Sequence, residues 1–214
     1  MQRIGRPFSP TRGTLEGYAR QRRLNCSTVP ISRVIRLSLD PPRDGYRVQG
    51  RLRVDHHMPL LNRIQQKIGL VPPAAENLFT TVKHRKLDSE QHNKVQWLRC
   101  FGDRGNETHF ESTWTMDSPL AGVEQIGPLL FAQRIEMVGG STTTEPGRTT
   151  RLIHEGTTLR GLGLPVPSWL VALETTMTPR PGRRAYDLAV RVTLLGRPMV
   201  SYTGLLEEAC EEAG

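Results

Sequence analysis

The 214-residue sequence has few large apolar anchors and lacks any long hydrophobic run. Hydrophobic residues make up 36% of the chain and aromatic residues 6%, which is enough for one domain with a core. No apolar stretch approaches the roughly 18 residues of a membrane-spanning helix. No segment combines a charged start, an apolar centre and a small-residue cleavage site, so we expect no secretory signal and no membrane span.

Cysteine is equally scarce. The three cysteines are Cys26, Cys100 and Cys210, and they lie far apart in the sequence. This spacing matches no zinc motif, and an odd number of cysteines does not form a complete disulfide set. We therefore expect an intracellular, reducing environment and no metal or other cofactor.

Lysine is rare, and the positive charge is concentrated at the start of the chain. Of 29 basic residues only four are Lys, and residues 1–54 hold twelve Arg against three acids, a balance of +9. Residues 55–214 hold seventeen bases and eighteen acids, a balance of −1. The body of the protein therefore lacks the clustered charge of a nucleic-acid-binding face.

The basic leader, residues 1–28, is poor in apolar residues and has Glu16 as its one acid. Such a segment buries too little apolar surface to offset its chain entropy. It is typical of a disordered tail or of a mitochondrial presequence, and less so of a nucleic-acid-binding arm. We expect a mitochondrial location if the chain is eukaryotic and the leader is a presequence, and a cytoplasmic one otherwise.

Residues 29–208 are predicted to form a single β-rich domain, followed by a tail at 209–214. Short alternating segments are separated by turn-forming residues, which favours antiparallel pairing of consecutive strands. The fold class is α+β and β-dominated: a curved antiparallel sheet or partly closed β-barrel of about nine strands, packed on one or two helices. The predicted strands span 46–54, 78–87, 94–101, 107–116, 129–138, 151–160, 171–178, 185–195 and 199–206.

Two segments outside the strands have clear local signals. Pro59 is suited to the first turn of a helix, whose apolar stripe would be Leu60, Leu61, Ile64 and Ile68 and which Gly69 would end. Residues 29–39 are compatible with a short helix or a strand. The segment 161–170, with Pro165, Pro167 and Trp169, is either a lid or a rigid connection whose Trp plugs one end of the barrel, and we favour the plug.

Strand parity makes Arg99 the most informative candidate for a site. Val95, Trp97, Arg99 and Phe101 share the apolar face of one predicted strand. A cation there is either paired, with Glu124 as partner, or lines a cavity in which it binds an anionic group. Aromatic side chains on inward faces, Phe110, Trp114 and Tyr202, belong either to the core or to the wall of such a cavity. The candidate ligand-binding residues are therefore Arg99, Glu124, Trp97, Phe110, Trp114 and Tyr202.

Neither metal binding nor catalysis has a recognisable motif. Asp55, His56 and His57 are adjacent, and because neighbours on a strand point to opposite faces, both histidines would bind one metal only in a turn, with Asp55 as a further ligand. Gly161 and Gly163 precede a proline and do not open a dinucleotide-binding helix. Catalytic residue types are present but stand in no acid/base or nucleophile pattern: His154, Glu155, Glu124, Glu136 and Glu174.

An ordered series of motifs resembles a bacterial family known as domain of unknown function 4166, often fused behind a saccharopine-dehydrogenase-like reductase domain. The resemblance covers about residues 29–208 and implies a β-rich domain with no established reaction. The motifs are Val48-x-Gly50-x-x-x-Val54, Trp97-x-Arg99-x-Phe101-Gly102, Phe110-x-Ser112, Glu124-x-x-Gly127-Pro128-Leu129-x-Phe131, Leu162-Gly-Leu-Pro-x-Pro-x-Trp-Leu170, Tyr186-Asp187 and Tyr202-x-Gly204-x-Leu206.

The leading functional hypothesis is a non-catalytic module that binds an apolar or lipid-like small molecule with an anionic end near Arg99. One alternative is a structural subunit or assembly factor of a larger complex, motivated by the leader and by the basic face of strand 46–54. Another is an accessory domain to a separate reductase, which rests on analogy with the family's neighbour. Nucleic acid is not an expected partner of the body.

Overall fold

The structure is a computed structural model, which describes residues 32–42, 45–67, 71–87, 94–103, 105, 107–118, 120–139 and 148–209. The leader, Cys26, Cys210 and Gly69 lie outside the described residues. Within this part of the chain, no helix has the length and apolar character that crossing a bilayer requires. The elements are α1 (Arg33–Leu39), β1 (Tyr46–His56), α2 (Pro59–Lys67), β2 (Ala75–Lys86), β3 (Lys94–Phe101), β4 (Thr108–Ser118), β5 (Ala121–Ile126), β6 (Leu129–Val138), β7 (Thr149–Leu159), β8 (Leu164–Val166), β9 (Val171–Pro179), β10 (Ala185–Leu194) and β11 (Arg197–Glu208).

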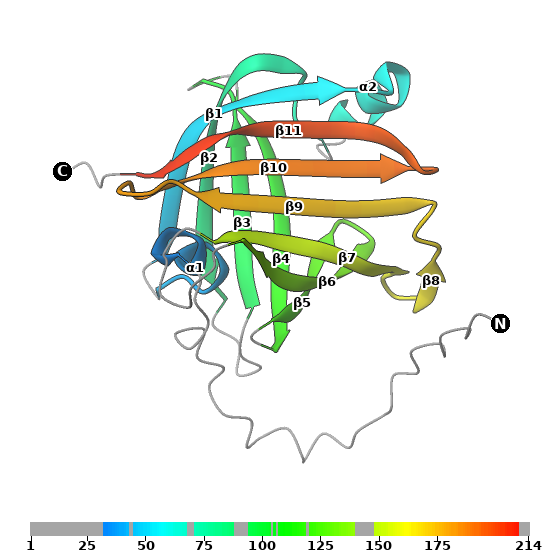
Figure 1. Cartoon of the computed structure of the whole chain (residues 1–214). Helices are drawn as coiled ribbons and strands as arrows, with labels where there is room; N and C mark the ends of the chain where they lie inside the picture. The colour runs from blue at the N-terminus through cyan, green and yellow to red at the C-terminus, as the bar shows by residue number, and fades with distance from the viewer. Residues whose placement is uncertain are drawn as a thin grey trace.

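Ten strands form a closed antiparallel barrel (Figure 1). Neighbouring strands are mostly consecutive in the chain, and β1 pairs with β11. The ring closes where β6 pairs with β7 and β7 pairs with β9. Strand β8 adds to the free edge of β7 outside the ring. The predicted β-dominated antiparallel fold is thus confirmed, with full closure in place of partial closure.

Two strands were missed by the sequence patterns. Strand β5 has only six residues between two turns, and it completes the pairing between β4 and β6. Strand β8 has three residues and lies within the segment that we expected to be a connection. Strands this short have too few alternating positions to be recognised from the sequence, and only their pairing with neighbouring strands defines them.

Strand β1 shows the alternation that the sequence predicted. Its inward residues, Val48, Leu52 and Val54, are buried, whereas Arg47, Arg51 and Arg53 are exposed. Glycine is required at one position of this strand, because a Cβ atom at Gly50 would lie 1.9 Å from the carbonyl oxygen of Leu205 on β11.

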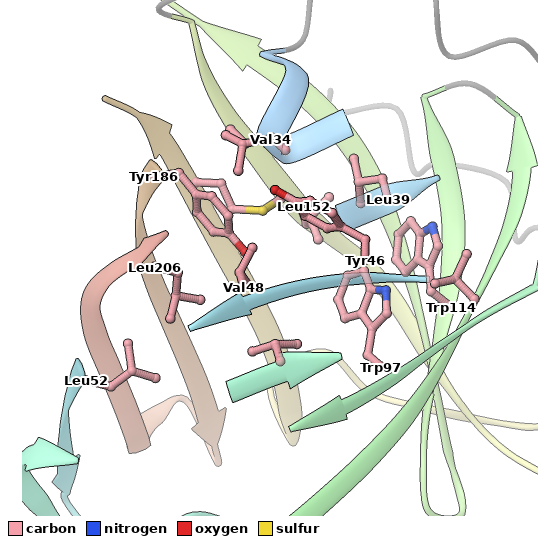
Figure 2. Close-up of a cluster of buried hydrophobic side chains, with 14 of the residues drawn as sticks. Val34, Leu39, Tyr46, Val48, Leu52, Trp97, Trp114, Leu152, Tyr186 and Leu206 are labelled. Carbon is pink, nitrogen blue, oxygen red and sulfur yellow. The ribbon is translucent and has the colours of Figure 1, made fainter. Parts of the chain in front are cut away.

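One end of the barrel is filled by the main hydrophobic core, over which α1 packs (Figure 2). Segment 29–39 is therefore a helix where it is described. Its Val34, Ile35 and Leu39 are buried against side chains from the strands. The helix contacts β1, β9 and β10. The barrel interior is thus closed at this end by a helix of seven residues.

Helix α2 begins at Pro59 as predicted, and the structure describes two side chains of its predicted apolar stripe. Leu61 packs against the main core, whereas Leu60 is exposed. Among the described side chains of this helix Asn62 is buried, and its amide donates a 2.9 Å hydrogen bond to the carbonyl oxygen of Met199. The side chains of Ile64 and Ile68 lie outside the described residues. The helix lies at the opposite end of the barrel from α1 (Figure 1), and a side-chain to backbone bond anchors it there.

Candidate functional site: an apolar cavity with a paired arginine and glutamate

The end of the barrel that α1 leaves open contains a cavity of about 390 Å³. Its walls are side chains of β3–β6 and β8–β11, together with the segments that connect the strands at this end. The lining is mostly apolar, and its few polar side chains are Arg99, Glu124, Thr175 and Tyr202. The apolar lining residues are Val71, Pro72, Phe101, Phe110, Ile126, Pro128, Leu129, Phe131, Val166, Leu170, Val171, Leu173, Val192, Leu194, Met199 and Val200.

Three adjacent strands bring the charged residues of the cavity together. Arg99 on β3 donates from Nη2 to Oε1 of Glu124 on β5, at 3.0 Å. It also donates from Nη1 to Oγ of Ser112 on β4, at 2.7 Å. The Ser112 hydroxyl in turn donates to the same Glu124 oxygen at 2.7 Å. The predicted Arg99–Glu124 pair is confirmed, and its positive charge is balanced inside the barrel.

Two aromatic rings hold the guanidinium of Arg99 in place. Its central carbon lies 5.1 Å from the ring centroids of both Trp97 and Phe110, which is within the range of cation–π attraction. Only 11% of the Arg99 side chain and 3% of the Glu124 side chain are accessible to solvent. The Arg99 side chain is thus fixed by one carboxylate, one hydroxyl and two rings.

Several polar groups of the cavity remain open to a ligand. Oε1 of Glu124 accepts both hydrogen bonds, and for Oε2 we find no partner among the described residues. For the hydroxyl of Tyr202 we likewise find no hydrogen bond within this part of the chain. Burial raises the pKa of the Tyr202 hydroxyl, so the group stays protonated and is able to donate. The cavity therefore offers one acceptor and at least one donor close to an apolar wall.

The structure separates the six predicted site residues into two groups. Arg99, Glu124, Phe110 and Tyr202 line the cavity, whereas Trp97 and Trp114 lie beneath it in the main core. Their rings stack at 5.8 Å with an interplanar angle of 11°. Trp97 still supports the site, because its ring contacts the guanidinium of Arg99. Whether any of the six binds a ligand stays a prediction.

Beneath the cavity, the stacked tryptophans continue into a buried aromatic ladder. The His84 ring lies 5.7 Å from that of Trp97 and 5.9 Å from that of Tyr46. Burial, and secondarily the charge of Arg99, lowers the pKa of His84 to about 3. His84 is therefore neutral at physiological pH and acts as a core side chain.

Sequence reasoning missed Ser112 as a partner of the Arg99–Glu124 pair and Thr175 as a cavity residue. Ser112 shares an inward face with Phe110 and Trp114, so its orientation was readable, but its partners come from two neighbouring strands. Thr175 is on β9, and only closure of the barrel brings it to the same cavity. No spacing within one segment signals either residue.

Trp169 does not plug the barrel, which corrects our expectation for segment 161–170. Its side chain is 63% exposed, and Leu162 and Leu164 are exposed as well. The segment turns back on itself to add β8 to β7, and its residues that line the cavity are Val166 and Leu170. Leu162, Leu164 and Trp169 of this segment are therefore exposed to solvent.

The other candidate residues lie away from the cavity. Arg134 pairs with Glu136 and Glu155 on the surface, Glu174 is exposed, and His154 packs on Phe131. Of the residue types considered for catalysis, only Glu124 lines the cavity.

The adjacent histidines of β1 and the following turn have separate partners. His56 Nε2 lies 2.9 Å from the carbonyl oxygen of Pro72, and His57 Nε2 lies 2.9 Å from Oγ of Ser201. A cluster of Cys100, Glu107 and His109 brings three donor atoms within 4.8 Å of one another. Burial raises the pKa of Cys100, so the thiolate that a metal would need is disfavoured.

The family model described as "Domain of unknown function (DUF4166)" matches residues 36–206. The chain belongs to this family. The match confirms the resemblance carried by the ordered motifs, and it includes every strand up to most of β11. A search of curated proteins and a search of solved structures found no match to the chain. A fused or neighbouring reductase stays a prediction, as does a role in the assembly of a larger complex.

Proposed function

We propose that this domain binds one small, mainly apolar molecule inside the barrel, with the molecule's polar end at the Arg99–Glu124 pair. The single observation that carries the proposal is the cavity, whose volume of about 390 Å³ lies within the usual range of ligand pockets. It has room for roughly a dozen water molecules. Water gains few hydrogen bonds along so apolar a wall, so an apolar ligand that replaces it is favoured.

The charge balance of the site favours an uncharged polar end. Glu124 already neutralises Arg99, so an anionic ligand would add a net negative charge to a poorly solvated cavity. An alcohol, an amide or a protonated acid would instead donate to Oε2 of Glu124 and accept from the Tyr202 hydroxyl. This differs from the sequence-based hypothesis of an anionic ligand, which treated Arg99 as the unpaired anchor.

The test is a displacement assay with matched probes. A fluorescent hydrophobic probe is bound to the purified chain and displaced with decanol, decanoate or decane. We expect decanol to bind more tightly than decanoate or decane at neutral pH. Tyr202→Phe should weaken the binding of decanol by about five- to tenfold, equivalent to about 1 kcal/mol for one lost hydrogen bond.

A blocking variant provides the control for location. Val192 lines the cavity from β10, and Val192→Trp should abolish probe binding by filling the space. Thr193 is its neighbour on the same strand and has the opposite parity, so Thr193→Trp should leave binding intact. Equal binding by both variants would place the probe elsewhere and refute the proposal, as would the absence of binding to the wild-type chain.

A further inference from the structure

Four large apolar side chains stand exposed at the mouth of the cavity. We name this set, Leu162, Leu164, Trp169 and Leu195, the mouth rim. Each is at least 55% exposed. They lie in the β7–β8 turn, in β8, in the β8–β9 connection and in the β10–β11 turn. Single exposed apolar residues are ordinary, but several of them on connections at one end of a barrel indicate an interaction site.

Backbone hydrogen bonds join the segments of the mouth rim to one another and to the cavity. The amide of Leu195 donates to the carbonyl oxygen of Leu170 at 2.8 Å, and that of Arg160 donates to Pro128 at 2.7 Å. Leu170 and Pro128 both line the cavity. Figure 1 shows β8, the start of β9 and the β10–β11 turn at the same end of the barrel. The segments that carry the mouth rim therefore adjoin residues that line the cavity.

Two of the turns that carry the mouth rim have residues with positive φ angles. Gly161 and Gly163 have positive φ angles of 86° and 63°, and Leu195 has a φ angle of 54°. A positive φ is uncommon for a residue such as leucine and is a genuine strain when the side chain is bulky. Asparagine tolerates this conformation better, so Leu195 is not the residue that the turn itself prefers. Its presence there calls for a reason outside the fold.

The two segments that carry the mouth rim hold charge of one sign. Residues 156–173 and 193–200 contain no Asp or Glu, and their only charged residues are Arg160 and Arg197. Both arginines are exposed. Exposed Leu and Trp side chains flanked by Arg are typical of surfaces that enter the interface of a bilayer. The guanidinium groups of such a surface contact the anionic headgroups.

We propose that the mouth rim docks on the surface of a phospholipid bilayer that contains anionic lipids. In the docked barrel the opening of the cavity faces the acyl region of the bilayer. An apolar ligand then passes between membrane and cavity without crossing water. This step rests on the proposed function, because the docking gives the cavity access to its ligand. Docking itself depends only on the mouth rim and its two arginines, and so it is tested separately.

The experiment is vesicle flotation of the full chain with phosphatidylcholine vesicles, with and without phosphatidylglycerol. We expect binding that is stronger with the anionic lipid, and a blue shift of Trp169 fluorescence on binding. The variant Trp169→Ser/Leu195→Asn should lose at least tenfold in partitioning. The matched control is Leu120→Ser, because Leu120 is exposed in the β4–β5 turn at the opposite end of the barrel. The control should bind like the wild type.

The outcomes separate the two proposals. If Val192→Trp still floats while it binds no probe, docking is independent of the cavity, as we expect. If wild type floats but neither wild type nor variant binds a probe, docking stands and the proposed function fails. No flotation with anionic vesicles, or equal flotation of the mouth-rim variant and the wild type, overturns the docking proposal, and a protein partner then becomes the explanation of the exposed patch.

Discussion

Substitutions of Arg99 and Glu124 should be strongly coupled in their effects on the free energy of unfolding. Replacing Glu124 with Leu removes the acceptor of two hydrogen bonds and leaves a guanidinium whose side chain is only 11% exposed. Loss of one partner of a buried ion pair costs about 3–5 kcal/mol. The Ser112 hydroxyl and two aromatic rings still contact Arg99, so we expect a value near the lower end, about 3 kcal/mol. Arg99→Met should cost a similar amount.

The double variant Arg99→Met/Glu124→Leu should be more stable than either single variant. It leaves no unpaired charge, and apolar replacements of a buried pair are often close to neutral. The remaining cost is the Ser112 hydroxyl without its partners, about 1–2 kcal/mol. For a domain of this size, 3 kcal/mol corresponds to a fall of about 6–12 °C in Tm.

The assay is urea unfolding monitored by far-ultraviolet circular dichroism. Tryptophan fluorescence is avoided because Trp97 contacts Arg99, so the substitution itself would change the signal. Arg134→Met serves as control: it breaks the exposed pairs with Glu136 and Glu155, which should shift the midpoint little because solvent screens them. Additive single effects, with the double variant losing their sum, would refute the view that the two charges compensate each other inside the barrel.

Three further predictions concern the core and the surface. The pKa of His84 is lowered to about 3, so between pH 6.5 and 3 this side chain binds one proton fewer in the folded than in the unfolded state, and folding stability should fall as pH falls through this window. His84→Phe should flatten this dependence, whose slope is up to about 1.4 kcal/mol per pH unit, and an unchanged slope would contradict the assignment. Gly204→Ala should prevent normal folding because its Cβ would lie 2.1 Å from the carbonyl oxygen of Arg51, whereas Gly156→Ala meets no atom within 4 Å and should fold; circular dichroism spectra of the two variants decide this. Trp169→Phe should remove most acrylamide-quenchable fluorescence, because the other two tryptophans are buried; strong residual quenching would show that the core tryptophans are accessible.

Local pattern was sufficient where a residue's environment depends on its own strand. The alternation around Arg47–Arg53 predicted which side of β1 is buried, and the parity of Val95 to Phe101 placed Arg99 inward. Both follow from the two-residue period of a strand. Family membership likewise came from the order of short motifs along the chain.

Pairing between distant segments decided the rest. The sequence determined that this chain makes a β-rich domain with an inward arginine, because strand periodicity and turn residues act locally. Only the tertiary structure decided that β6 meets β7 to close the ring, that Thr175 and Tyr202 share one cavity with Glu124, and that Trp169 faces solvent. Each of these depends on contacts between strands far apart in the chain, and the burial of a side chain in a connection depends on what the closed barrel places against it.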